Sequence, residues 1–149
     1  MNFSSRIVEA MTDDELATVQ RYLREHNQTA NPLWWSKFVD PQHDDRPLQI
    51  VALNARNECV GGLLATSSMK WLKVNIMAVR PDVRRSGVGS MLLSAAENEG
   101  KHRGCEYAFL DTMQFQAPDF YRKCGYQVAG SIPDWDSHGN TKFFFTKQL

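Results

Sequence analysis

The chain has 149 residues, and 42% of them are hydrophobic, which is enough for one buried core without support from a metal or disulfides. Its 17 Lys and Arg residues balance 17 Asp and Glu residues, so no net charge attracts the protein to nucleic acid or to an anionic membrane. No apolar stretch is long enough for a membrane span or for a signal peptide at the start, and we expect a cytoplasmic protein of one domain.

The first third of the chain favours helices. Thr12 and Glu15 form a capping box, and the apolar residues that follow recur at helical spacing, which predicts a helix over about residues 13–26. Before it, residues 6–10 are expected to form a short strand. A proline-rich stretch with clustered aromatic residues predicts a second, short helix over residues 33–39.

From Leu48 onward the pattern is that of strands. Two apolar runs joined by the polar residues 54–57 predict a β-hairpin. Residues 71–79 alternate in character and predict a third strand, which Pro81 ends. The alternation places Asn75 and Met77 on the opposite side of this strand from Val74 and Ile76.

The second half continues with alternating elements. Apolar residues at helical spacing predict an amphipathic helix from about Gly87 to Gly100, and a strand is predicted over 107–110. A short helix is expected from Ala117 to just before Gly125. The chain closes with strand-like runs at 126–129 and 142–146, and this order of elements indicates a mixed α/β sheet domain.

Cysteine and histidine patterns do not favour a metal site. Cys59, Cys105 and Cys124 are odd in number and far apart, which fits neither a disulfide framework nor a paired-cysteine metal site. The four histidines show no metal-binding spacing. We expect no bound metal and three buried or half-buried thiols.

The most informative segment is the turn at residues 84–90, between a strand and a helix. The first amides of a helix are free to bind an anion, and Gly87 and Gly89 lack the Cβ atoms that would hold a phosphate away from the backbone. Arg84 and Arg85 add positive charge beside them. The turn is therefore a candidate phosphate site.

Other interpretations of this turn differ in their requirements. A dinucleotide-binding GxGxxG motif would need glycine where Leu92 stands, and the Gly-Lys-Ser/Thr of a P-loop does not occur. A turn whose glycines only redirect the chain and whose arginines are only solvated stays open as the alternative. The strand before the turn and the amphipathic helix after it favour the phosphate site.

These residues resemble a known family. The block from about Trp71 to Tyr126 looks like the acyl-CoA-binding core of the GNAT superfamily of N-acyltransferases, whose signature Arg/Gln-x-x-Gly-x-Gly/Ala is matched by Arg84, Gly87 and Gly89. The family's later motif, Asn-x-x-Ala-x-x-Phe/Leu-Tyr-x-x-x-Gly-Phe/Tyr, is similar to residues 114–126. The resemblance implies a single domain over residues 1–149. It also implies an α/β (α+β) fold, with a mixed, mostly antiparallel sheet of six to seven strands flanked by helices.

The resemblance also implies a site. The turn amides would hold the pyrophosphate of coenzyme A, and the backbone of the preceding strand would pair with the pantetheine arm. The residues implied in cofactor binding are Met77, Val79, Arg84, Arg85, Ser86, Gly87, Val88, Gly89, Ser90 and Gln114. The residues implied in catalysis are Tyr121, which matches the position that protonates the departing thiolate, and Asn75. Asn75 stands where many relatives carry an acidic base, and Gln114 where Asn is common.

The expected activity is transfer of an acetyl group from acetyl-CoA to a primary amine of a small molecule or a protein, by direct attack on the thioester. A phenol such as Tyr121 is protonated near neutral pH and suits a proton donor. Asn75 accepts no proton and instead would orient water or the amine.

The general base stays open among Asp111, the late-loop residues Asp134, Asp136 and His138, and water. The alternative function is a non-catalytic acyl-CoA-binding or sensor domain, which the amide at Asn75 would permit. No nucleic-acid or membrane partner is expected, and a homodimer is left open.

Overall fold

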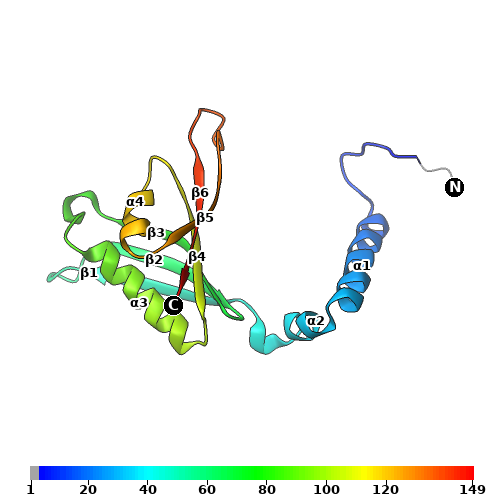
Figure 1. Cartoon of the computed structure of the whole chain (residues 1–149), viewed down its shortest axis with the longest axis horizontal. Helices are drawn as coiled ribbons and strands as arrows, with labels where there is room; N and C mark the ends of the chain where they lie inside the picture. Colours follow the sequence, from blue (N-terminus) through cyan, green and yellow to red (C-terminus); the bar gives the residue numbers. More distant parts are fainter. Residues whose placement is uncertain (1–3) are drawn as a thin grey trace. The chain divides into compact units, whose positions relative to one another are not determined.

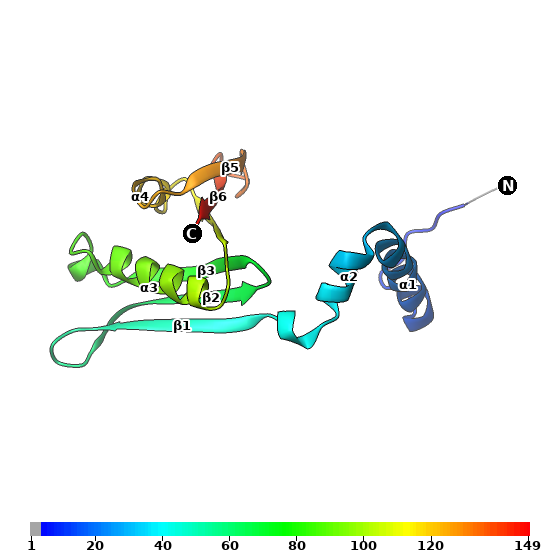
Figure 2. The ribbon, with the colours of Figure 1, turned by 60° about the horizontal axis from the view of Figure 1, so that its bottom comes forward.

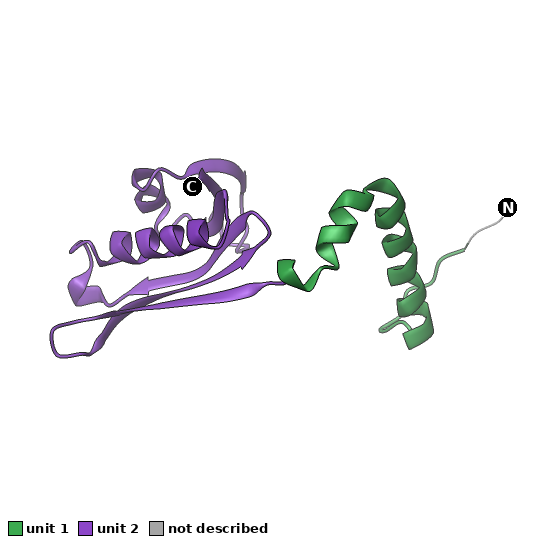
Figure 3. Ribbon diagram, turned by 90° about the horizontal axis from the view of Figure 1, so that it is seen from below, with its two compact units in different colours: residues 1–43 green, residues 44–149 purple. Residues whose placement is uncertain are grey.

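The computed structural model describes residues 4–149 and divides them into two compact units, up to His43 and from Asp44 onward. Figure 3 distinguishes the units by colour, and each is described by itself. A single domain over residues 1–149 therefore stays a prediction.

The first unit consists of helices. Helix α1 spans Asp13–Ala30, and the capping box is present, with Thr12 and Glu15 bonding each other's backbone amides. The short helix α2 spans Pro32–Phe38. A single 3₁₀ turn, Pro41–His43, follows. Both predicted helices are confirmed, and α1 continues to Ala30.

The strand predicted over residues 6–10 is wrong. These residues form no regular structure, and the described part of this unit contains no strand that could pair with them. Arg6 instead donates a 2.5 Å hydrogen bond to Glu15 on α1.

The second unit is built on one sheet of six strands in the order β1-β2-β3-β4-β6-β5, which lies within the predicted six to seven (Figure 1). Neighbouring strands are antiparallel except β3 and β4, which are parallel. The strands are β1 Arg46–Leu53, β2 Cys59–Ser68, β3 Trp71–Val79, β4 Tyr107–Met113, β5 Gln127–Ile132 and β6 Lys142–Gln148. The predicted fold class is confirmed.

The helices of this unit lie where the sequence predicts them. A 3₁₀ turn, Pro81–Val83, precedes α3, which spans Val88–His102, and α4 spans Pro118–Lys123. Helix α3 packs along β1, β2 and β3, as Figure 2 shows. A Cβ added to Gly100 would lie 3.1 Å from Leu72 Cδ2, so the glycine lets the helix approach the sheet closely.

The core lies between α3 and the sheet. One face of α3 is buried, and so are alternate residues of β4 and of the first half of β3, as the two periodicities require. The side chains of Leu63, Leu72, Leu92, Leu110 and Phe145 are at most 2% exposed. The opposite sheet face, called the outer face below, carries more exposed side chains.

A bulge in β3 separates the two halves of the sheet. Leu64 pairs with Ile76 and the next residue of β2, Ala65, pairs with Val74, so Asn75 is an extra residue without a partner on β2. The parallel pairing of β3 with β4 ends at Val74. Beyond this rung the two strands separate, and the last part of β3 forms no ladder with β4.

The bulge also reverses the alternation of side chains along β3. Val74 is buried, but Ile76 is 59% exposed, and Met77 and Val79 pack against the core. The prediction that Met77 lies on the opposite side of the strand from Val74, and Ile76 on the same side, is therefore wrong, because the extra residue shifts all later side chains to the other face.

Cys105 is buried and Cys124 is half-buried, as predicted, but Cys59 is exposed, because it lies at the start of β2 next to the hairpin turn. Within residues 4–149, no helix combines the length and the apolar character needed to cross a bilayer. The same residues contain no group of three or more side chains placed to hold a metal ion.

Candidate active site

The turn before α3 forms a concave backbone. Arg85 and Gly87 both have left-handed φ angles, 64° and 88°. The Ser86 hydroxyl donates a hydrogen bond to the carbonyl of Val83, which closes the turn. Gly87 caps α3 without a side-chain hydrogen bond to the helix, so no capping side chain occupies the first amides of α3.

The two glycines of the turn differ in their surroundings. A Cβ on Gly87 would meet no atom within 4 Å, but its φ of 88° disfavours any other residue. A Cβ on Gly89 would lie 3.4 Å from Phe120 Cζ and 3.9 Å from Val79 Cγ2. Gly89 therefore also allows α3 to pack against α4, a role that the sequence motif does not reveal.

The arginines near the turn are not equally available to a ligand. Arg80 holds Asp82 through two hydrogen bonds of 2.6 and 2.8 Å. Arg84 Nε donates to the carbonyl of Val79 at 3.1 Å and braces the end of β3. Arg85 has no ion-pair partner among residues 4–149, so its charge is free for an incoming anion.

Tyr121, on α4, is buried against Phe145 of β6. It is 8% exposed, and its ring packs against Phe120, Tyr126 and Phe145, with centroid distances of 5.2, 6.0 and 6.1 Å. Burial, with smaller contributions from Cys124 and Asp111, raises the pKa of Tyr121. The phenol therefore keeps its proton at neutral pH and suits a donor.

Asn75 and Asp111 are the first residues of β3 and β4 after the last shared rung, Val74 with Leu110. Asp111 follows buried Leu110 on a regular strand, so its side chain belongs to the outer face. The Asn75 side chain belongs there too, because its hydrogen-bond partner on β2, Thr66, lies between two buried residues. Asn75 Nδ2 donates a 3.0 Å hydrogen bond to Thr66 Oγ1. Asp111 forms a 2.8 Å ion pair with Lys142.

Gln114 fastens the loop after β4. Its backbone N–H donates to the carbonyl of Thr141 at 2.8 Å, and its side-chain oxygen accepts from the backbone N–H of Thr141 at 3.2 Å. Gln114 is thus placed next to the start of β6, and its cofactor-binding role stays a prediction.

The acidic residues of the β5–β6 loop serve the loop itself. Asp134 accepts from the Gly139 amide at 2.7 Å, and Asp136 accepts from the amides of His138 and Asn140, each at 3.0 Å. Hydrogen bonds, above all from the Asn140 side chain, lower the pKa of Asp136. These contacts weaken the case for Asp134 and Asp136 as the base.

Sequence reasoning did not single out Lys142. Its ammonium, paired with Asp111, lies 4.6 Å from the centre of the Trp135 ring and 5.7 Å from that of Phe144. The pairing of β4 with β6 would have indicated that Phe144 lies beside Asp111, since the two residues are directly opposite each other.

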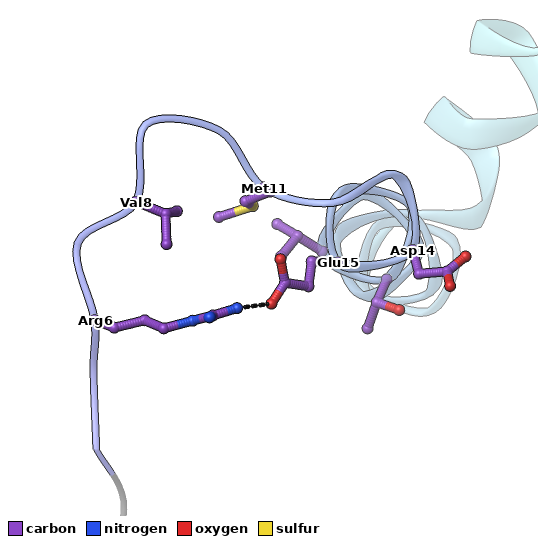
Figure 4. A pocket seen from close by; sticks show the side chains of 7 residues that line it. Arg6, Val8, Met11, Asp14 and Glu15 are labelled. Carbon is purple, nitrogen blue, oxygen red and sulfur yellow. Dashed lines mark hydrogen bonds and ion pairs between the residues drawn. The ribbon is translucent and has the colours of Figure 1, made fainter.

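A pocket of about 460 Å³ lies in the first unit, between α1 and the chain before it (Figure 4). Its lining contains none of the predicted site residues and consists of Arg6, Val8, Met11, Asp14, Glu15, Thr18 and Val19. Arg6 and Glu15 join across it.

Comparisons with known proteins agree with this geometry. The model of the acetyltransferase (GNAT) family matches residues 8–126. Blasticidin-S acetyltransferase of Streptomyces morookaense is 37% identical over 113 residues, 73% of this chain and 82% of that protein. The crystal structure of an acetyltransferase from Bacillus cereus is 27% identical, with a TM-score of 0.75 and coverage of 97% of this chain and 98% of that one.

An aminoglycoside 6′-N-acetyltransferase complexed with coenzyme A shares the fold, with a TM-score of 0.62 at 15% identity, covering 95% of this chain and 97% of that one.

Proposed function

Since this chain belongs to the acetyltransferase (GNAT) family and is an acetyl-CoA-dependent N-acetyltransferase, we propose that its acceptor is a primary amine of a small molecule. The relative that is 37% identical is a blasticidin-S acetyltransferase, which makes blasticidin S the first acceptor to test. A cytoplasmic location stays a prediction from the sequence.

The observation that carries the proposed site is the turn before α3. Its left-handed residues, Arg85 and Gly87, shape the backbone, and the α3 amides that follow have no capping side chain. Such a cradle fits the pyrophosphate of coenzyme A, and the guanidinium of Arg85 adds the opposite charge. The residues assigned to this contact are Arg84, Arg85, Ser86, Gly87, Val88, Gly89 and Ser90.

The end of β3 would bind the pantetheine arm. After the bulge, β3 no longer pairs with β4, so backbone groups at Met77 and Val79 are available to an extended, amide-bearing ligand that takes the place of a neighbouring strand. Val79 also holds Arg84 through its carbonyl, which leaves its amide for the ligand. Acetyl-CoA supplies the activated acetyl group at the point where the strands part.

The chain's own residues then serve the transfer. The acceptor amine, as the neutral form, attacks the thioester carbonyl, the new C–N bond forms and the C–S bond breaks. Tyr121 donates its proton to the departing thiolate, for which its raised pKa is suitable. The Asn75 side-chain nitrogen donates to Thr66, which fixes the orientation of the amide group. The side-chain oxygen then orients the acceptor amine, or a water molecule that removes a proton from the amine.

The test is release of the free thiol from acetyl-CoA across a panel of amines that includes blasticidin S. We expect release that depends on the amine and a product whose mass is increased by one acetyl group. Binding of acetyl-CoA with no release above the amine-free control would instead support the binding-only alternative, which the similarity to named acetyltransferases disfavours.

A further inference from the structure

The Lys142 ammonium occupies a small receptor made by three other residues. Asp111 Oδ1 lies 2.8 Å from Lys142 Nζ, and the rings of Trp135 and Phe144 lie 4.6 and 5.7 Å away. The two rings meet edge to face, with centroids 6.4 Å apart. A carboxylate combined with two aromatic rings is the environment that binds an alkylammonium ion. We call Asp111, Trp135 and Phe144 the ammonium box.

The box lies at the point where the transfer would occur. Asp111 is the first residue of β4 beyond its last pairing with β3, and it belongs to the same outer face as Asn75. Its charge also acts on buried Tyr121. An amine that approaches from the outer face would therefore meet Asp111 before it reached the thioester.

Lys142 is able to leave the box. The Lys142 side chain is 18% exposed and the Asp111 side chain 42%, so water reaches the carboxylate and solvent screening weakens the ion pair from that side. Lys142 is the first residue of β6, next to the exposed loop, so its long side chain can turn into water. Asp111 Oδ2 accepts no hydrogen bond from any of residues 4–149, which leaves it ready for a second donor.

Building on the proposed function, we propose that the ammonium box is the subsite for a positively charged group of the acceptor, and that Lys142 fills it until a cationic acceptor displaces it. Lys142 then acts as a specificity residue. A neutral acceptor gains nothing from the box, whereas an acceptor with an ammonium group replaces one cation by another and leaves no buried charge unpaired.

The experiment measures binding of n-butylammonium chloride to the full chain by tryptophan fluorescence, because Trp135 is half exposed and lines the box. The variants are Lys142→Gln, which empties the box, and Asp111→Asn, which removes its charge. Lys70→Gln is the control for the loss of a lysine from an ion pair outside the box, because Lys70, just before β3, pairs with Glu106 in a more exposed position. Trp135→Phe identifies the reporting ring, and equal melting temperatures confirm folding.

We expect n-butylammonium to bind Lys142→Gln at least threefold more tightly than the wild type or Lys70→Gln, and Asp111→Asn at least threefold more weakly. The KM for blasticidin S should shift in the same directions, with the KM for acetyl-CoA unchanged. If all four proteins bind n-butylammonium equally, the box is not a subsite. If the binding pattern appears but blasticidin S is not acetylated, the box is supported and the proposed acceptor is wrong.

Discussion

Burial of Tyr121 raises the pKa of the phenol, so the side chain keeps the proton that it is proposed to donate. The ring is held by Phe120, Tyr126 and Phe145, so a phenylalanine would fill the same space. No hydrogen bond among the described residues includes the Tyr121 hydroxyl, so its removal leaves no other group unsatisfied. The hydroxyl can therefore be tested separately from the ring.

We expect Tyr121→Phe to fold and to bind acetyl-CoA like the wild type, while kcat falls by about 10²- to 10⁴-fold, the range for one positioned proton donor. Steady-state thiol release at saturating acetyl-CoA measures kcat. A loss below about threefold, with chemistry shown to be rate-limiting, means that the thiolate takes its proton from elsewhere.

The phosphate turn is tested best at Gly87, because a side chain at Gly89 would also press on Phe120. Gly87→Ala forces an alanine into φ of 88°, at a cost of about 1–2 kcal/mol, and relief of this strain moves the turn amides. We expect acetyl-CoA to bind about tenfold more weakly by calorimetry.

Gly104→Ala is the matched control for the turn. Gly104 has a φ of 89°, and a Cβ there would meet no atom within 4 Å, but it follows the far end of α3. We expect a similar loss of stability and unchanged acetyl-CoA affinity. Equal affinities of the two variants would remove the turn from the site.

Asn75→Ala should lower kcat about fivefold, the effect of one lost hydrogen bond of about 1 kcal/mol, without changing the affinity for acetyl-CoA. Comparison of the melting temperature with kcat distinguishes a role of Asn75 in turnover from a role in stability. A lower melting temperature with unchanged turnover per folded molecule would show that Asn75 serves only the bulge.

Among the elements, the β5–β6 hairpin loop illustrates how acidic residues can be structural. The Asp136 carboxylate accepts hydrogen bonds from the backbone amides of His138 and Asn140 and from the side chain of Asn140. These bonds stabilise the loop that carries Trp135. Because the pKa of Asp136 is lowered in the fold, this contribution is present above its unfolded pKa of about 4 and is lost as the pH falls below it.

Asp136→Asn should lower the melting temperature and leave the shape of the pH profile of kcat/KM unchanged, because the residue stabilises the loop and takes no proton from the substrate. Activity measured from pH 5 to 9 checks this. Loss of the acidic limb of the profile would instead identify Asp136 as the base.

At the scale of the whole molecule, α3, the α4–β5 connection and β6 meet in one buried cluster. Lys147 donates a 2.7 Å hydrogen bond to Glu97 and lies 5.4 Å from the centre of the Tyr126 ring. Burial, followed by the charge of Glu97, strongly raises the pKa of Tyr126. The Tyr121 pKa is raised as well.

The folded protein should therefore lose stability in alkali. Above about pH 10 the unfolded chain ionises these tyrosines first, while the fold retains their protons, so the free energy of unfolding falls as the pH rises. We expect Tyr126→Phe to make this decline shallower, as measured by urea unfolding from pH 8 to 11. Tyr22→Phe, at an exposed tyrosine, is the control and should keep the slope of the wild type.

Local patterns in the sequence determined most elements and predicted the chemistry of the turn. The capping box at Thr12 and the helical spacing in α3 act between near neighbours, so the sequence shows them directly. The alternation predicted for β3 holds only as far as Val74, because the bulge depends on β2. The strand predicted over residues 6–10 was wrong because a strand also needs a partner.

Tertiary structure alone decided the arrangement of the candidate site. The bulge at Asn75 depends on pairing with β2, the burial of Tyr121 depends on Phe145 of β6, and the contact of Gly89 depends on Phe120 of α4. The pairing of Lys142 with Asp111 likewise joins two strands. Such contacts depend on how distant segments pack, and no periodicity within a single segment records them.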